Sequence, residues 1–276
     1  MRDLSHDKAL LAINSATVKS LSLEQCVDAI ARAGIGGIAP WRDIVQACGV
    51  DKAGRHIRDA GLAVSCLCRG GMFTAADAAG RAAALDDNRR AVDEAAAIGA
   101  QCLVLVVGGL PQNSRDIVGA RTQVREALHA LLPHAREAQV PLGMEPLHPM
   151  YAADRACVNT LAQANDLCDE LGEGAGVVVD TYHVWWDPDL ERQIARAGKK
   201  ILAYHVNDWL LPTTNLLLDR GMMGDGVIDL RAIRAMVERA GYRGHCEVEI
   251  LSRKNWWKWD PAAVLRVCIE RHQTAV

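Results

Sequence analysis

Phenylalanine is nearly absent from this chain: one Phe occurs in 276 residues, against seven Trp and four Tyr. Phe is the aromatic residue best suited to an apolar core, because the indole N–H of Trp needs a hydrogen-bond partner. The composition therefore predicts a core of Val, Ile, Leu and Ala and another role for Trp. Half of the residues are hydrophobic and 24% are charged, which excludes a disordered or collagen-like chain.

The chain also lacks a strong charge bias and a long apolar run. Its formal net charge is −3, whereas proteins that bind nucleic acid need a basic face for the phosphates. No stretch of about 18 consecutive apolar residues is present. The first residues, Met-Arg-Asp-Leu-Ser-His-Asp-Lys, contain no apolar signal-peptide core. We therefore expect a cytoplasmic protein with no nucleic-acid or membrane partner.

The nine cysteines form neither a disulfide nor a zinc pattern. Their number is odd and most of them lie in apolar segments, as reduced, buried thiols do. Cys66 and Cys68 lie two residues apart, which on a strand places both thiols on one face. No second pair of Cys or His residues completes a zinc site. We therefore interpret this pair as structural.

Short apolar runs alternate with amphipathic segments along the whole chain, with no linker between them. Eight runs are predicted to be buried strands: Leu10–Ser15, Gly36–Trp41, Ala63–Arg69, Cys102–Gly108, Leu142–Leu147, Val177–His183, Ile201–Asp208 and Cys246–Leu251. Helical patterns separate them, for example Leu23–Ala33, Ala75–Ile98, Ile117–Ala138, Leu161–Leu171, Leu190–Ala197 and Leu230–Ala240. Eight strand–helix units predict a single (β/α)8 barrel domain over residues 1–276. A doubly wound open sheet is the alternative, but the glycine pairs do not form the G-x-G-x-x-G motif that it needs.

Catalytic groups of such barrels lie at the C-terminal ends of the strands. Four successive predicted strands end in a carboxylate, a carboxylate, an imidazole and a carboxylate: Glu145, Asp180, His205 and Glu249. An acid in apolar surroundings is costly unless a counter-charge compensates it. One divalent cation compensates all of them, and oxygen and nitrogen ligands together suit Mn²⁺, Co²⁺, Mg²⁺ or Zn²⁺. The alternative is that separate Arg or Lys residues neutralise each acid.

The eighth predicted strand offers two acids, Glu247 and Glu249, which point to the same side because they lie two residues apart. We prefer Glu249 as the ligand because it lies nearer the C-terminal end of the strand. Glu247 lies deeper, where a buried Arg is its expected partner.

The segments at these strand ends resemble the sugar phosphate isomerase/epimerase group of xylose-isomerase-like barrels, which includes ketose 3-epimerases, inosose dehydratases and hydroxypyruvate isomerases. The resemblance spans nearly the whole chain and rests on Met-Glu145-Pro-Leu, Asp180-Thr-Tyr-His183, His205-Val-Asn-Asp208, Glu249-Ile-Leu and the Gly224-Asp225-Gly226 turn. It implies that Glu145, Asp180, His205 and Glu249 bind the metal. It also implies that His183 and Arg220 contact substrate. His148 and the Trp pairs depart from the better-known epimerases.

The predicted chemistry follows from this set. A cation that binds a ketone oxygen and the neighbouring hydroxyl acidifies the C–H between them by stabilising an enediolate. We expect Glu145 and Glu249 to exchange that proton, which epimerises a ketose or interconverts an aldose and a ketose. Further candidates for substrate contact are Arg69, His148, Trp41 and Trp186. Asp208 is a candidate for orienting His205.

Other functions compete with this prediction. An endonuclease of the same superfamily needs more His ligands and a basic face, which the chain lacks. A lyase or dehydratase on the same metal site remains open. A catalytically silent sugar-binding subunit is disfavoured because it has no need for the complete ligand set.

All seven Trp residues follow predicted strands, so we expect them at the mouth of the barrel: Trp41, Trp185, Trp186, Trp209, Trp256, Trp257 and Trp259. Indole faces there stack on a carbohydrate substrate or form the contact of a homodimer. The Trp residues favour a substrate with an apolar face or an aglycone.

Overall fold

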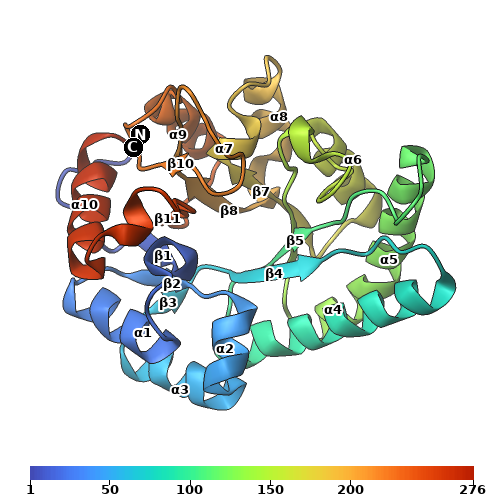
Figure 1. Cartoon of the computed structure of the whole chain (residues 1–276), viewed down its shortest axis with the longest axis horizontal. Coiled ribbons are helices and arrows are strands. Elements are labelled where there is room, and N and C mark those ends of the chain that lie inside the picture. Colours follow the sequence, from blue (N-terminus) through green and yellow to red (C-terminus); the bar gives the residue numbers. More distant parts are fainter.

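The computed structural model describes all 276 residues and contains a nine-stranded sheet that curls into a barrel (Figure 1). Neighbouring strands are parallel and follow the order β3-β2-β1-β11-β8-β7-β6-β5-β4. Their bounds are β1 Leu11–Asn14, β2 Gly37–Ala39, β3 Ala63–Val64, β4 Leu67–Gly71, β5 Leu103–Val106, β6 Leu142–Met144, β7 Ala175–Asp180, β8 Ile201–Val206 and β11 Cys246–Val248. A separate antiparallel pair joins β9 (Asp208–Trp209) to β10 (Arg220–Gly221).

The third predicted strand is split into two, and this split closes the barrel. β3 pairs with β2, whereas β4 pairs with β5 on the other side. Two single bridges, Trp41 with Cys68 and Val64 with Ala100, join the two ends of the sheet. β3 and β4 therefore occupy one position of the barrel, and the fold is the (β/α)8 barrel that the sequence predicts.

Helices surround the barrel and connect successive strands (Figure 1). Their bounds are α1 Leu23–Arg32, α2 Arg42–Cys48, α3 Val50–Asp59, α4 Ala78–Ile98, α5 Ile117–Glu137, α6 Leu161–Leu171, α7 Thr181–Val184, α8 Leu190–Ala197, α9 Leu230–Arg239 and α10 Pro261–Thr274. Short 3-10 helices lie at Ser15–Val18, Pro149–Tyr151, Gly198–Lys200 and Trp256–Lys258. α1 and α6 begin with complete capping boxes, in which Ser22 pairs with Gln25 and Thr160 with Gln163.

The core is aliphatic, as the low Phe content predicts. A large cluster of buried Leu, Ile, Val and Ala residues packs the helices on the sheet, and the one Phe, Phe73, belongs to it. A second, small cluster fills the barrel interior with small side chains: Ala39, Cys66, Cys68, Cys102, Val104, Val178 and Ala203. Small interior residues leave room for polar groups at the C-terminal ends of the strands. None of the helices combines the length and hydropathy that a membrane crossing requires.

Candidate metal centre and substrate cavity

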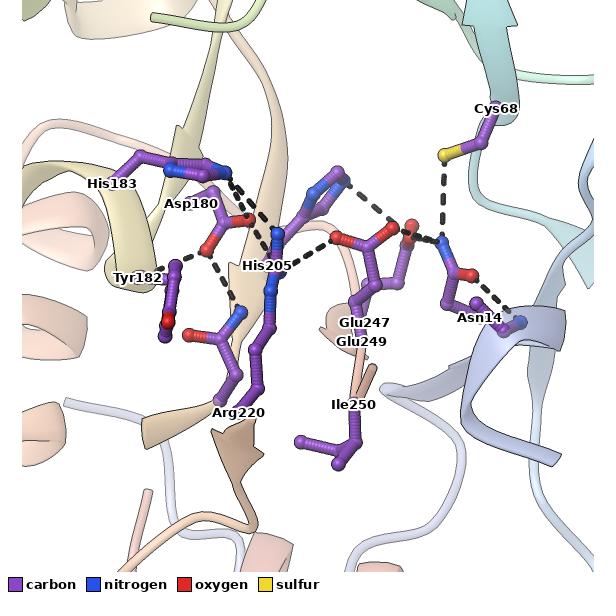
Figure 2. A network of polar contacts seen from close by, with 12 residues as sticks. Asn14, Cys68, Asp180, Tyr182, His183, His205, Arg220, Glu247, Glu249 and Ile250 are labelled. Carbon is purple, nitrogen blue, oxygen red and sulfur yellow. Dashed lines mark hydrogen bonds and ion pairs between the residues drawn. The ribbon is translucent and has the colours of Figure 1, made fainter. Parts of the chain in front are cut away.

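Four polar side chains from successive barrel strands meet at the C-terminal rim of the barrel. Glu145 follows β6, Asp180 ends β7, His205 lies in β8 and Glu249 follows β11. One ligand atom from each lies within 4.8 Å of the others, and all four side chains are buried. Figure 2 shows Asp180, His205 and Glu249 converging from neighbouring strands. The four residues that the sequence singles out as ligands are thus brought together in space.

Two atoms of this group are buried without a hydrogen-bond partner. They are Oε1 of Glu145 and Nδ1 of His205, which lie 3.2 Å apart. Buried polar atoms are almost always hydrogen-bonded, so this pair is an exception that calls for another partner. A carboxylate oxygen and an imidazole nitrogen are both ligands for divalent transition metals. The donor set therefore fits a divalent cation.

The guanidinium of Arg220 compensates part of the negative charge. Its Nη1 lies 3.0 Å from Oδ2 of Asp180 and 2.9 Å from Oε2 of Glu249. Burial alone would raise the pKa of Asp180, but Arg220, with help from His183 and from the amide of Asn207, lowers it to about 2. The sequence offered Arg pairing as an alternative to the metal. The structure shows such pairing for two of the three acids and leaves Glu145 without an Arg or Lys partner.

Burial shapes the other titratable groups of the site. It raises the pKa of Glu249 to about 7, against the opposing charge of Arg220. Burial would lower the pKa of His205, but the carboxylates of Glu247 and Glu145 raise it well above its usual value. Burial and Arg220 together lower the pKa of His183 to about 3, although Asp180 opposes them. The neutral His183 ring can therefore accept a hydrogen bond at neutral pH.

Glu247 lies on the other side of the His205 ring. Its Oε1 is 3.4 Å from Nε2 of His205 and accepts a hydrogen bond of 3.0 Å from Asn14. Its Oε2 accepts hydrogen bonds from Ser65 and Cys66, at 2.8 and 3.1 Å. The expected Arg partner of Glu247 is thus replaced by a histidine and three neutral donors. Glu249, as preferred from the sequence, is the acid that joins the rim group.

Asn14 links the two acids. Its Nδ2 also donates to Oε1 of Glu249 at 3.2 Å (Figure 2), and its Oδ1 accepts the indole N–H of Trp41 at 2.8 Å. Asn14 was not among the predicted site residues. It ends the first apolar run, Leu-Ala-Ile-Asn, and a polar residue in that position is the sequence feature that indicates a place at the rim.

A cavity opens above the rim group and encloses about 470 Å³ of empty space, including its opening to solvent. Six residues outside the ligand set were predicted to contact substrate, and four of them line this cavity beside Glu145 and Glu249: Trp41, Arg69, His183 and Arg220. Tyr151 and Arg155 also line it, and the sequence did not point to either.

His148 and Trp186 do not line this cavity; they contact His183, which does. The backbone N–H of His148 donates to Nδ1 of His183 at 3.2 Å. Trp186 donates its indole N–H to the carbonyl oxygen of His183 at 2.8 Å. The ring of His148 stacks on Trp209 at 4.9 Å between centroids. Both residues thus hold His183, whose Nε2 lies 3.2 Å from Nη2 of Arg220.

Asp208 does not orient His205, contrary to the sequence prediction. Its carboxylate accepts hydrogen bonds from the backbone N–H groups of Gly224, Gly226 and Ile228, at 2.8 to 3.0 Å. This arrangement fixes the loop after β10, and β10 carries Arg220. The sequence could not show it, because the loop returns to Asp208 from 16 to 20 residues away.

The chain belongs to the family described as the xylose isomerase-like TIM barrel, whose sequence model matches residues 27–267. None of the curated proteins compared with the chain matches it in sequence.

Solved structures agree with this assignment. Protein SMc04130 from Sinorhizobium meliloti 1021 is 58% identical, with 98% of this chain and 99% of that chain covered and a TM-score of 0.96. The IolI protein, solved with a zinc atom, is 19% identical, with 94% and 95% covered and a TM-score of 0.81. The 3-keto-D-glucoside 4-epimerase YcjR from E. coli is 20% identical, with 97% and 100% covered and a TM-score of 0.78. IolI and YcjR share the fold with this chain.

Proposed function

We propose that this protein is a divalent-metal-dependent isomerase or epimerase that acts on a ketose or keto-polyol. The observation that carries the proposal is the convergence of Glu145, Asp180, His205 and Glu249 beside a cavity that Glu145 and Glu249 line, with two of their donor atoms buried and unpartnered. The zinc atom in IolI and the epimerase activity named for YcjR, both on this fold, support it.

The four rim residues would hold the cation, and Mn²⁺, Co²⁺, Mg²⁺ and Zn²⁺ are the candidates. When bound, such a cation supplies Lewis-acid polarisation of a substrate carbonyl and its neighbouring hydroxyl. Glu145 and Glu249 are the two carboxylates of the set that line the cavity. They act as the acid–base pair that takes the proton from carbon and returns it, because each reaches the cavity from a different strand.

Arg220 and His183 bind substrate oxygens in this proposal. Nη2 of Arg220 and Nε2 of His183 lie 3.2 Å apart, and both residues line the cavity. A guanidinium donates hydrogen bonds, and Nε2 of the neutral His183 ring also donates, because Nδ1 already accepts the backbone N–H of His148. The pair therefore matches a carbonyl oxygen and an adjacent hydroxyl.

An apolar pocket beside the main cavity supports a substrate with an apolar face or an aglycone. Its apolar lining consists of Trp257, Ile44, Leu21 and Ala16, and it shares Trp41 and Leu251 with the main cavity. Ser15, Lys19 and Asp43 also line it, and Nζ of Lys19 lies over the ring of Trp257 at 5.3 Å. Indole faces bind the C–H surface of sugars and other apolar groups. A glycoside could thus place its reacting ring above the rim group and its aglycone in the second pocket.

The test is proton exchange in D₂O, followed by NMR with a panel of ketoses, 3-keto-glycosides and inososes. The metal-loaded protein should incorporate deuterium at the carbon next to the carbonyl. Glu249→Gln and Glu145→Gln should each slow exchange by about 10²–10⁴-fold. Glu126→Gln, a change of an exposed glutamate on α5, is the matched control and should exchange normally.

Three results would contradict the proposal. Full exchange in both active-site variants would remove these carboxylates from the acid–base role. An enone product in place of an isomer would assign the site to a lyase or dehydratase. Substrate binding without exchange in the metal-loaded protein would make the chain a sugar-binding subunit.

A further inference from the structure

Two arginines line the cavity without an acidic partner. Arg69 and Arg155 both contribute to its wall. Their guanidinium groups form no ion pair or hydrogen bond within the protein, and the nearest aromatic contact is that of Arg155 over the ring of Tyr151, at 5.8 Å. Arg220, in the same cavity, contacts two carboxylates. Arg42, which follows Trp41, is also fully paired, with Asp87 and Glu94.

The backbone holds both unpaired arginines in place. Arg69 lies in the middle of β4 and is half-buried. Arg155 lies beside the bridge between Gly108 and Ala156, and its carbonyl oxygen accepts the N–H of Gly108 at 2.9 Å. Burial lowers the pKa of Arg69, and the positive charge of Arg155 lowers it further. The two like charges thus act on each other across the cavity wall.

The acids of the cavity do not balance these charges. A divalent cation and Arg220 together offset the three carboxylates of Glu145, Asp180 and Glu249. Glu247 lies beyond His205, outside the cavity lining, and is already hydrogen-bonded by neutral donors. Arg69 and Arg155 therefore leave the loaded cavity with an excess of positive charge.

We propose that Arg69 and Arg155 form an anion subsite, so that the substrate of this protein carries a carboxylate or a phosphate group at a distance from its reacting carbon. Guanidinium groups bind both anions through paired N–H donors. The inference rests on the proposed function for the carbohydrate part of the substrate, but the anion subsite itself is a property of the cavity.

The first experiment titrates the metal-loaded protein with inorganic phosphate and with malonate, followed by calorimetry or by the fluorescence of Trp41 and its neighbours. Both anions should bind, and binding should weaken as salt is added. Arg69→Gln and Arg155→Gln should each weaken it by about tenfold or more, because each removes a charge-assisted contact. Arg253→Gln, a change of an exposed arginine that does not line the cavity, is the matched control.

The second experiment compares three probes of one scaffold in the metal-loaded protein: D-fructose, D-fructose 6-phosphate and D-fructuronate. At least one anionic probe should bind about tenfold more tightly than D-fructose, and the preferred one identifies the group as phosphate or carboxylate. Arg69→Gln should erase that preference, whereas Arg253→Gln should keep it.

The inference is overturned if neither simple anion binds the wild-type protein, or if the arginine variants weaken neutral and anionic probes equally, which is the behaviour of hydroxyl-binding residues. Anion-selective binding without deuterium exchange would refute the proposed isomerase and keep the subsite. Deuterium exchange without a preference for the anionic probes would refute the anion subsite and keep the proposed isomerase.

Discussion

Arg220 allows a quantitative test of the site, because one buried guanidinium compensates two buried acids. It is 4% exposed, and its Nη1 lies within 3.0 Å of both Asp180 and Glu249. Removing one partner of a buried ion pair costs about 3–5 kcal/mol, since the remaining charge stays uncompensated. Glu249 relieves part of that cost by taking up a proton, because its pKa is already about 7. We therefore expect Arg220→Met to lower the free energy of unfolding of the metal-free protein by about 3 kcal/mol.

Urea unfolding in EDTA and in excess Mn²⁺ measures this change. A cation that binds only the folded protein stabilises it by about 2.7 kcal/mol at a hundredfold excess over its dissociation constant. The loss of Arg220 makes the site more negative, so Mn²⁺ should stabilise the variant more than the wild type. Arg239→Met is the control: it breaks an exposed pair with Glu191 and should cost no more than about 1 kcal/mol. A loss below about 1 kcal/mol for Arg220→Met in EDTA, or an equal loss with and without Mn²⁺, would refute the reasoning.

Three further predictions concern glycine geometry, metal binding and buried thiols. Gly71→Ala should lower the free energy of unfolding by more than about 3 kcal/mol in urea titrations, because its φ is 105° and a Cβ would lie 1.9 Å from the carbonyl oxygen of Val106. Gly99→Ala is the control: its φ is 72° but a Cβ there would meet open space, so it should cost only about 1 kcal/mol. Glu247→Gln should weaken metal binding by about 10–100-fold in a chelator competition, because the carboxylate behind a ligating histidine fixes its tautomer, and unchanged affinity would contradict this role. Stability should fall as the pH rises above 9. Burial raises the pKa of four thiols from 9.0 to about 12, namely those of Cys26, Cys168, Cys246 and Cys268. Between these two values only the unfolded chain releases the thiol protons, so a rising pH favours unfolding. Each of these thiols should remove about 1.4 kcal/mol of unfolding free energy at pH 10. Cys168→Ala should therefore reduce the drop between pH 8 and 10, measured under reducing conditions, by about 1.4 kcal/mol.

The sequence predicted the barrel and the four polar side chains that meet at its rim because both depend on local patterns. Buried parallel strands appear as short apolar runs, and a polar residue at the end of such a run marks the catalytic rim. Glu145, Asp180, His205 and Glu249 each end one of these runs. The strand ends themselves were predicted too long: β7 ends at Asp180, where α7 begins, and β6 ends at Met144. Hydrophobicity alone could not show these ends, because the residues that follow are also buried.

Long-range pairing could not be predicted. Arg155 lies in a polar loop segment, and only the bridge to Gly108 brings it to the cavity. His272 falls in a helical pattern near the C-terminus, which gives no sign that it is buried. The structure buries it completely and places Nε2 2.9 Å from Asp7, since the two ends of the chain lie side by side (Figure 1). Gly108 and Ala156 are 48 residues apart in the sequence, and Asp7 and His272 are 265 apart.

The break in the third strand explains how the metal centre acquires its orientation. Ser65 and Cys66 are neighbours in sequence, yet both donate to the same oxygen of Glu247. Adjacent residues of a regular strand point to opposite faces, so this convergence requires the irregular segment between β3 and β4. With Oε2 held by these two donors, Glu247 presents Oε1 to Nε2 of His205. Nδ1 of His205 then faces Glu145, which makes the split that closes the barrel also the feature that directs the histidine toward the rim group.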